Sequence, residues 1–322
     1  ASFYLLIIMS KTALICGVSG QDGAYLSQLL LSFGYNVIGT SRDAESNEFT
    51  NLERLKIRSQ VKLVSMVLND YESVLSVISK FEPDEVYNLA GQTSVNLSFE
   101  RPVETMESIS AGVLILLEAI RFTNKKIRLY NACSGECFGN TGMEPATETT
   151  PFRPRSPYAA AKAASFWQVE IYRQAYDLFA CSGLLFNHES PLRPEQFVTK
   201  KIIDGVKKIA SGELALITLG NLDISRDWGY AGDYVEPMWK MLQIDEPTDF
   251  IIATGKTHSL KEFVKKSFEA YSLDWRKFVK VDKSLFRPLD VHMSSASPMK
   301  AKERLGWEAK NTLDDLIKIM NN

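Results

Sequence analysis

The chain has 322 residues, of which 45% are hydrophobic and 24% are charged, and its formal net charge is −2. This composition is typical of a soluble globular protein. The near-neutral charge argues against a nucleic acid or an anionic membrane surface as partner. The length accommodates one large α/β unit or two closely joined domains.

The cysteine and histidine content indicates the compartment and argues against a metal site. Cys16, Cys133, Cys137 and Cys181 form no Cys-x-x-Cys pair and lie in or beside predicted strands, which is typical of reduced, buried thiols. We therefore expect a cytoplasmic protein. The three histidines lack the spacing of zinc ligands, so no metal is expected. The apolar run at residues 3–9 is too short to span a bilayer and lacks the organisation of a signal peptide.

The first predicted unit is a buried strand at residues 11–16, followed by Gly17-Val-Ser-Gly-Gln-Asp-Gly23 and by a helix that ends at Gly34. A strand, a glycine turn and a helix in this order are the context that a dinucleotide-binding motif requires. Glycine permits the tight turn and lets the backbone approach a pyrophosphate at the helix N-terminus. We predict that a dinucleotide contacts Gly17, Gly20, Gln21, Asp22 and Gly23.

The second predicted strand, at residues 35–39, indicates which dinucleotide binds. An acidic residue usually follows this strand where the ribose 2′-hydroxyl of NAD is bound, but the chain continues as Thr40-Ser41-Arg42. A cation without that carboxylate favours a 2′-phosphate, so we predict that Arg42 helps to bind NADP. The alternative is that Arg42 is a solvated loop charge.

Further strands are predicted at residues 61–64, 85–89, 127–131 and 181–185, alternating with helices near residues 71–80 and 103–122 and with a helix that contains Tyr158. This alternation predicts an α/β fold with a doubly wound parallel sheet of the Rossmann type. The ligand crevice of such a sheet lies at the carboxyl ends of its strands. The glycine turn, Ala90-Gly91-Gln92, Ser134 and Glu136 all fall there, which places the active site at this edge.

After residue 186 the alternation weakens, and this half of the chain is predicted to form a smaller C-terminal domain that covers the crevice and binds the substrate. We expect the dinucleotide-binding domain to span residues 9–185, rejoined by about residues 223–254. The substrate-binding domain then comprises residues 186–222 and 255–322.

The spacing of Tyr158 and Lys162 suggests an acid–base pair. Residues four apart share one face of a helix, and a nearby ammonium favours the phenolate, which lowers the tyrosine pKa from its usual value of about 10. Such a phenol suits the removal of a hydroxyl proton. Ser134 can hydrogen-bond a reacting oxygen and Glu136 can move a second proton, with both on one face if the strand continues past Ser134. The alternative is a chance pair on a surface helix.

The chain resembles the extended short-chain dehydrogenase/reductases and, within them, the GDP-mannose 4,6-dehydratases. The resemblance runs from about Lys11 to the last predicted helix. Its specific motifs include the glycine turn, Glu148-Thr-Thr-Pro-Phe-Arg-Pro-Arg-Ser-Pro-Tyr158, Leu185-Phe-Asn-His-Glu-Ser-Pro191 and Arg226-Asp-Trp-Gly229.

The resemblance implies a lyase that converts GDP-mannose to GDP-4-keto-6-deoxymannose by internal hydride transfer through NADP and loss of water. Ser134, Glu136, Tyr158 and Lys162 match the family's catalytic positions. In this scheme Tyr158 takes the C4 hydroxyl proton, and Glu136 removes the C5 proton and helps to expel the C6 hydroxyl. One alternative is an NADP-dependent nucleotide-sugar reductase or epimerase, which does not need Glu136. Another is a non-catalytic NADP-binding protein, in which the Ser–Tyr–Lys set is expected to be incomplete.

The resemblance also implies the binding residues. For the cofactor they are, besides the glycine turn and Arg42, Leu89, Ala90, Tyr158, Lys162, Leu185, Asn187, His188 and Arg193. For the substrate they are Ser94, Ser134, Glu136, Asn187, Val198, Lys201, Gly220, Arg226, Arg287 and Asp290. Lys201, Arg226 and Arg287 are expected to converge on the nucleotide diphosphate. No nucleic acid or membrane partner is expected, and the protein is expected to be a homodimer or homotetramer.

Several positions depart from the family pattern. Cys133-Ser134-Gly135-Glu136 replaces Ser-Thr-Ser-Glu and keeps the hydroxyl, and Val67 stands where the family has an aspartate near the adenine. Arg42-Asp43 replaces paired arginines that are associated with a tetramer interface, which makes a dimer the alternative. Asp290 replaces a glutamate and is one methylene shorter.

Overall fold

The computed structural model describes residues 10–123 and 126–322, so the apolar run at residues 3–9 lies outside the described range. Within that range, the centre of the molecule is a seven-stranded sheet in the order β10-β6-β5-β4-β1-β2-β3, with every pair parallel. Its strands are β1 Thr12–Cys16, β2 Asn36–Ser41, β3 Lys62–Ser65, β4 Glu85–Asn88, β5 Arg128–Ser134, β6 Ala180–Leu185 and β10 Phe250–Ile252. The predicted α/β fold with a doubly wound parallel sheet is confirmed.

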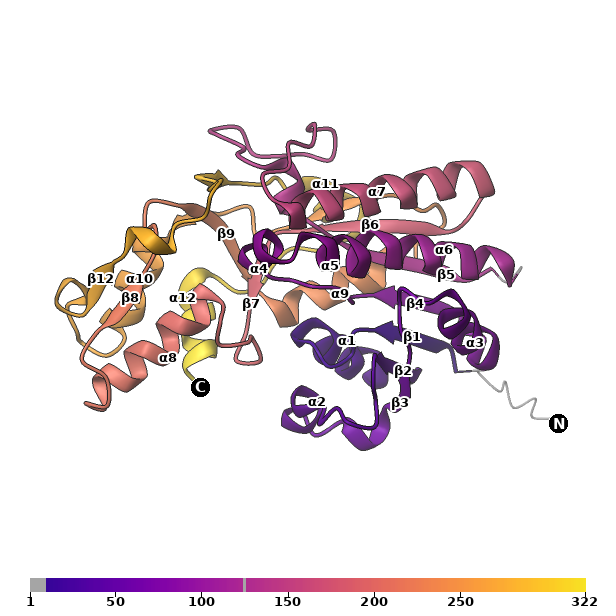
Figure 1. Ribbon diagram of the computed structural model, residues 1–322, viewed down its shortest axis with the longest axis horizontal. Coiled ribbons are helices and arrows are strands. Elements are labelled where there is room, and N and C mark those ends of the chain that lie inside the picture. The colour runs from indigo at the N-terminus through magenta and orange to yellow at the C-terminus, as the bar shows by residue number, and fades with distance from the viewer. Residues whose placement is uncertain (1–9, 124–125) are drawn as a thin grey trace, which may run out of the picture.

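Helices cover both faces of this sheet (Figure 1). They are α1 Gln21–Ser32, α9 Ala231–Met241 and α11 Met299–Leu305 on one face and α3 Tyr71–Phe81, α6 Gly112–Phe122 and α7 Pro157–Tyr176 on the other. Side chains alternate along each strand, so Ala13 and Ile15 pack under α1 and α9. Leu14 and Cys16 pack under α3 and α6. This alternation explains why the strands read as continuous apolar runs in the sequence.

The helix predicted at residues 103–122 is interrupted. It consists of α5 Pro102–Met106, a π-helical turn at Glu107–Ala111 and α6. The π turn precedes Gly112, where a Cβ would meet Leu68 Cδ2 at 2.9 Å. The absence of a side chain at Gly112 therefore allows this helix to lie close to the segment after β3.

The C-terminal half forms a second, smaller layer. It lies at the left of Figure 1, whereas strands β1, β2 and β3 lie to the right of it. Its strands are β7 Asn187–Glu189, β8 Ile217–Leu219, β9 Ser225–Tyr230, β11 Thr257–Ser259, β12 Val279–Val281 and β13 Met293–Ser294. Strand β9 pairs with β7, β11 and β13, and β8 pairs with β12. The helices are α8 Val198–Ala210, α10 Leu260–Glu269 and α12 Leu313–Asn321, which enclose a core of their own around Trp228 and Phe263. Two short helices, α2 Thr50–Arg54 and α4 Val95–Glu100, complete the fold.

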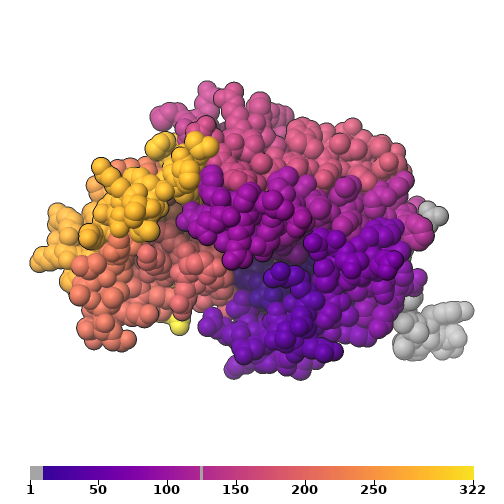
Figure 2. Space-filling view, in the orientation of Figure 1, coloured from indigo at the N-terminus to yellow at the C-terminus, as the bar shows by residue number. Residues whose placement is uncertain are grey.

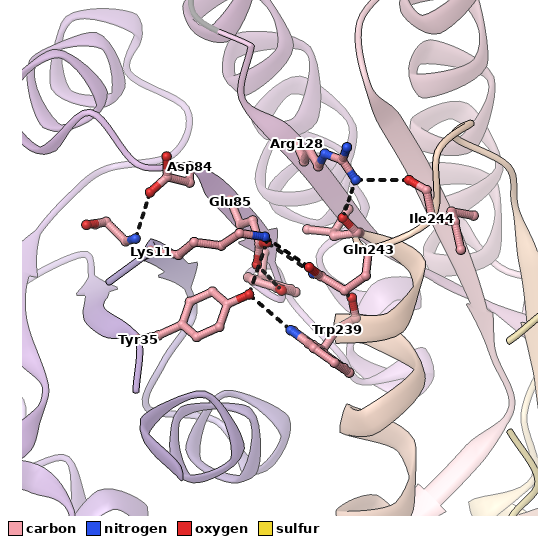
Figure 3. A network of polar contacts seen from close by, with 11 residues as sticks. Lys11, Tyr35, Asp84, Glu85, Arg128, Trp239, Gln243 and Ile244 are labelled. Atoms are coloured by element: carbon pink, nitrogen blue, oxygen red, sulfur yellow. Dashed lines mark hydrogen bonds and ion pairs between the residues drawn. The ribbon is translucent and has the colours of Figure 1, made fainter. Parts of the chain in front are cut away.

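The chain returns to the large sheet from Ala231 onward, where α9 packs on α1 and β10 pairs with β6. A buried network anchors this return at the amino ends of the strands (Figure 3). Glu85, which is 1% exposed, accepts hydrogen bonds from Lys11 Nζ at 2.9 Å, Tyr35 OH at 3.1 Å and Gln243 Nε2 at 3.0 Å. Several donors offset the cost of burying this carboxylate. The network fixes α9 to β4 at the edge opposite the predicted crevice.

Of the helices in residues 10–123 and 126–322, none combines the length and the apolar character that a membrane span requires.

Candidate active site

A cavity of about 230 Å³ lies at the carboxyl ends of β5 and β6, between the large sheet and the smaller layer. Figure 2 shows the orange C-terminal part of the surface meeting the purple N-terminal part. Fourteen of the predicted site residues line this cavity: Asp22, Leu89, Ser94, Ser134, Glu136, Tyr158, Lys162, Leu185, Asn187, His188, Arg193, Val198, Arg226 and Arg287. The sequence therefore located the cavity correctly, although its residues come from both halves of the chain.

Helix α7 presents Tyr158 and Lys162 to the cavity. The Ser156 side chain caps the helix by accepting a hydrogen bond from Ala159 N at 3.0 Å, and Pro157 occupies the first helical position. One turn separates the two side chains, and Lys162 Nζ lies 5.9 Å from the centroid of the Tyr158 ring. The Lys162 ammonium also donates to Ala132 O at 2.6 Å, which holds it against β5.

The sequence predicted a lowered pKa for Tyr158, but in the structure this pKa is raised. Burial raises the pKa of the Tyr158 phenol, a hydrogen bond with Ser134 acts in the opposite direction, and the negative charge of Glu136 raises it further. Burial likewise lowers the pKa of the Lys162 ammonium. Desolvation penalises the charged form of both groups, so burial favours the neutral phenol of Tyr158.

Glu136 reaches the cavity by a different backbone path from the one expected. Strand β5 ends at Ser134, and Glu136 lies in a 3₁₀ turn at Gly135–Phe138. Its backbone N donates to Ser134 Oγ at 3.2 Å. The strand does not continue past Ser134, because a 3₁₀ turn begins at Gly135, where a Cβ would meet the Phe186 ring at 2.8 Å.

Arg226, in β9, brings a buried cation to the cavity. Only 3% of the residue is exposed, and Nη1 donates to Ser225 O at 2.9 Å and to Val291 O at 2.7 Å. Burial lowers the pKa of the Arg226 guanidinium. Among the described residues, Arg226 Nη2 has no hydrogen-bond partner, and neither has Asp290 Oδ1, which lies 3.9 Å away. An unpartnered buried donor next to a cavity marks a place for an acceptor oxygen.

Arg287 also lines the cavity, and its charge acts on Arg226. Its Nε donates to Asn96 Oδ1 at 2.7 Å, and both residues line the cavity. Asn96 lies in α4, whereas Arg287 follows β12, so this contact joins the two halves across the mouth of the site. The sequence did not identify Asn96, because nothing in its local pattern distinguishes it from other surface amides.

A partly buried ion pair ties the first helix to the second half. His188 Nε2 lies 2.7 Å from Asp22 Oδ2, His188 Nδ1 lies 2.7 Å from Phe186 O, and the imidazole stacks on Tyr234. Burial acts to lower the pKa of His188, but the Asp22 carboxylate outweighs it and the pKa is raised. Burial acts to raise the pKa of Asp22, but His188 outweighs it and the pKa is lowered. The pair therefore favours an imidazolium and a carboxylate.

The glycine turn has the shape that a dinucleotide requires. Gly17 has φ +82°, and a Cβ on it would meet Ala90 Cα at 2.9 Å. A Cβ on Gly23 would meet Gly17 O at 2.6 Å. Helix α1 begins after Gly20 without a side-chain cap, so its first amides face outward to an anion. These residues fit a dinucleotide pyrophosphate.

The remaining predicted residues do not line the cavity: Gly17, Gly20, Gln21, Gly23, Arg42, Ala90, Lys201, Gly220 and Asp290. Of the three cations expected to converge on the nucleotide diphosphate, Arg226 and Arg287 line this cavity and Lys201 does not. Lys201 Nζ donates to Thr218 O at 2.7 Å and lines a separate cavity of about 250 Å³ with Glu195 and Lys208.

Comparisons with known proteins find similar chains over nearly the whole length of this one. The family model described as GDP-mannose 4,6 dehydratase matches residues 14–320. The chain is 45% identical over 320 residues to GDP-mannose 4,6 dehydratase 1 of Arabidopsis thaliana, covering 96% of this chain and 88% of the relative. It is 41% identical over 335 residues to the Homo sapiens GDP-mannose 4,6 dehydratase, covering 96% and 90%. The structure is similar to that of UDP-glucose 4-epimerase from Thermus thermophilus in complex with NAD, with a TM-score of 0.84, 28% identity and coverage of 96% and 97%.

Proposed function

The chain belongs to the GDP-mannose 4,6-dehydratase family, and we propose that it converts GDP-mannose to GDP-4-keto-6-deoxymannose with NADP as cofactor and with Ser134, Glu136, Tyr158 and Lys162 as its catalytic residues. The observation that carries this proposal is the convergence of these four side chains on one cavity. A damaged set would have favoured a non-catalytic dinucleotide-binding protein.

Tyr158 is the base for the C4 hydroxyl. Ser134 acts to lower the pKa of the Tyr158 phenol, and both residues line the cavity, so Ser134 is assigned to bind the same sugar oxygen and to pass a proton. Lys162, whose ammonium lies 5.9 Å from the ring centroid, favours the phenolate over the phenol. When bound, NADP supplies the hydride acceptor, later the hydride donor, and a positive charge that favours phenolate formation.

Glu136 is the acid–base group for elimination. It removes the C5 proton, which the C4 ketone has acidified, and gives a proton to the departing C6 hydroxyl, so that water leaves. Its carboxylate lies 4.0 Å from Arg226 Nε. This placement beside a fixed cation supports an acid–base role that a reductase or epimerase does not need.

The substrate diphosphate is proposed to lie against Arg226 and Arg287. Arg226 Nη2 supplies a buried donor without a hydrogen-bond partner among the described residues, and Arg287 supplies a second guanidinium to the same cavity. Guanidinium groups bind phosphate oxygens in pairs of parallel hydrogen bonds. Ser94, Asn187 and Val198 line the same cavity and complete the proposed substrate site. Lys201 is left out, because its ammonium is held by Thr218 O.

The cofactor is a nicotinamide dinucleotide, and we propose that Arg42 selects NADP over NAD. Arg42 is exposed just beyond β2, whose end hydrogen-bonds to the glycine turn through Gly17 N and Thr40 O at 3.2 Å. Its acidic neighbour Asp43 is occupied locally, accepting hydrogen bonds from Glu45 N at 3.0 Å and Ser46 N at 3.1 Å. This arrangement supports a cationic rather than an acidic contact to the ribose.

The protein is proposed to be a homodimer, with a homotetramer as the alternative. Helices α6 and α7 expose a row of large apolar side chains: Phe122 at 70%, Ile171 at 56%, Trp167 at 51% and Tyr176 at 46%. Contiguous exposed apolar surface is typical of an interaction site. A second copy of the same face would cover these side chains.

A cytoplasmic location is proposed because the four cysteines are buried, free thiols.

The proposed reaction is tested by incubating the protein with GDP-mannose and measuring the mass of the product. A product lighter by one water, formed without net consumption of NADPH, is expected. Tyr158→Phe, which removes only the phenolic oxygen, is the control and should give none. Net consumption of NADPH when a keto-sugar is supplied, without loss of water, would instead identify a reductase. An isomeric product of unchanged mass would identify an epimerase.

A further inference from the structure

Two thiols lie side by side next to the proposed catalytic residues. Cys133 Sγ, at the end of β5, is 3.6 Å from Cys137 Sγ, in the 3₁₀ turn that follows. Both are buried and free. Both also contact the first turns of α7, Cys133 through Lys162 O at 3.4 Å and Cys137 through Ala159 O at 3.8 Å. Cys133 is among the residues that line the cavity, with 2% of its surface exposed, so the cavity is the route by which a small oxidant would approach it.

The other two cysteines lie in ordinary core environments. Burial raises the pKa of the Cys16 thiol to about 12 and raises that of Cys181 as well. At Cys133 burial acts in the same direction, but the hydrogen bond from Cys137 and the positive charge of Lys162 outweigh it, and the pKa of this thiol is lowered. Because the thiolate is the reactive form of cysteine, Cys133 is the sulfur that an oxidant would attack.

We propose that Cys133 and Cys137 form a reversible redox site, in which a hydroperoxide oxidises the pair to a disulfide. The Cys133 thiolate attacks one peroxide oxygen, the O–O bond breaks, and Cys133 becomes a sulfenic acid while the second oxygen leaves as water or an alcohol. The Cys137 thiol then attacks the sulfenic sulfur, the S–O bond breaks, and water leaves. The two sulfurs together lose two electrons, which the peroxide accepts. A dithiol reverses the step.

The disulfide would also switch off the site. Ser134 and Glu136 lie between the two cysteines in the chain, and moving the sulfurs from contact to bonding distance draws the 3₁₀ turn toward the end of β5. This displaces the hydroxyl and the carboxylate from the cavity wall. The loss of activity rests on the proposed function, whereas formation of the disulfide does not.

The test uses the whole chain treated with hydrogen peroxide and followed by intact mass and by thiol labelling. We expect the mass to fall by that of two hydrogen atoms. After denaturation the label should react with Cys16 and Cys181 but not with Cys133 and Cys137. Dithiothreitol should fully reverse both changes. Cys137→Ala should stop at a sulfenic acid that dimedone traps on Cys133. Cys181→Ala, at a buried thiol outside the pair, should behave as the unmodified chain.

Three outcomes overturn the proposal. They are retention of all four thiols, a disulfide that includes Cys16 or Cys181, and oxidation of Cys133 to sulfinic acid while Cys137 stays free. A disulfide that forms with dehydratase activity unchanged overturns the switch. A chain that forms the disulfide but never dehydrates GDP-mannose when reduced overturns the proposed function and leaves the redox site supported.

Discussion

Arg226 Nε lies 4.0 Å from Glu136 Oε1, so a guanidinium from the smaller layer faces a carboxylate from the large sheet. Arg226 is anchored by two backbone carbonyls, and its Nη2 remains without a hydrogen-bond partner among the described residues. One cation is thus adjacent both to the proposed elimination base and to the proposed diphosphate position. If both proposed assignments hold, this single side chain contacts the groups that bind the nucleotide and that transfer the proton.

Glu136→Gln is expected to separate oxidation from elimination. The amide keeps the shape of the side chain but cannot accept the C5 proton. Oxidation at C4 should continue, so that NADPH absorbance appears on the enzyme, while product formation falls by at least about 10²-fold, the lower end of typical acid–base contributions. Stopped-flow absorbance and product mass measure the two steps. A variant that makes the 6-deoxy sugar at a near-normal rate would show that another group is the base.

Arg226→Lys is expected to weaken substrate binding although the charge is kept. An ammonium cannot reproduce the planar pair of donors, and truncating a buried charge contact costs about 2–5 kcal/mol. The kcat/KM for GDP-mannose should therefore fall by roughly 30-fold or more, measured by product formation. Arg276→Lys is the control, because Arg276 is exposed and paired with Asp274 at 2.9 Å. Equal kinetics of the two variants would remove Arg226 from the substrate site.

Arg42→Ala is expected to weaken NADP but not NAD. Hydrogen bonds to charged groups contribute about 1.5–3 kcal/mol, so the Kd for NADP should rise roughly 10–150-fold. Titration of protein fluorescence with each dinucleotide measures this change. Arg54→Ala removes an exposed cation from α2 and should leave both affinities unchanged. The prediction is wrong if the unmodified protein already binds NAD and NADP equally.

The Asp22–His188 pair is expected to make stability depend on pH. The pKa of His188 is raised in the folded protein, so its contribution is complete below the unfolded value of about 6.5 and is lost as pH rises through the raised pKa. The pKa of Asp22 is lowered, so its contribution is present above about 3.9 and is lost as pH falls through the lowered pKa. The difference in Tm between the unmodified protein and His188→Gln should therefore be larger at pH 6 than at pH 9.

Thermal unfolding of His292→Gln, which changes an exposed histidine outside the pair, is the matched control and should show no such dependence. A Tm difference for His188→Gln that is the same at both pH values, or larger at pH 9, would mean that the pair contributes as a neutral hydrogen bond.

Ile171→Glu is expected to convert the proposed dimer into monomers. Ile171 is 56% exposed on α7, and a carboxylate buried between two copies would lack a partner. Light scattering at several concentrations measures the mass in solution. Met143→Glu, at a side chain that is 92% exposed in a loop, should leave the mass unchanged. A chain that is monomeric before substitution would exclude the proposed interface, and a tetramer that becomes a dimer would assign it to one of two interfaces.

Local patterns in the sequence determined the elements and the general position of the site. Glycine is required where φ is positive and where another backbone lies within van der Waals distance, so Gly17 to Gly23 could be identified without coordinates. The apolar runs of the strands and the 3.6-residue period of the helices depend on near neighbours in the chain. The α/β order, the face shared by Tyr158 and Lys162 and the edge that holds the cavity followed from them.

Tertiary structure alone decided how the site is assembled and charged. Gly135 redirects the chain after β5 because the Phe186 ring occupies the space of a side chain, and this turn places Glu136 near Arg226. The pKa of Tyr158 is raised, chiefly by burial, although the spacing of Tyr158 and Lys162 alone suggested that it would be lowered. Lys201 donates to Thr218 O, and Cys133 meets Cys137. Each outcome depends on atoms brought together by packing, and a linear pattern carries no measure of burial or of distance between residues far apart in the chain.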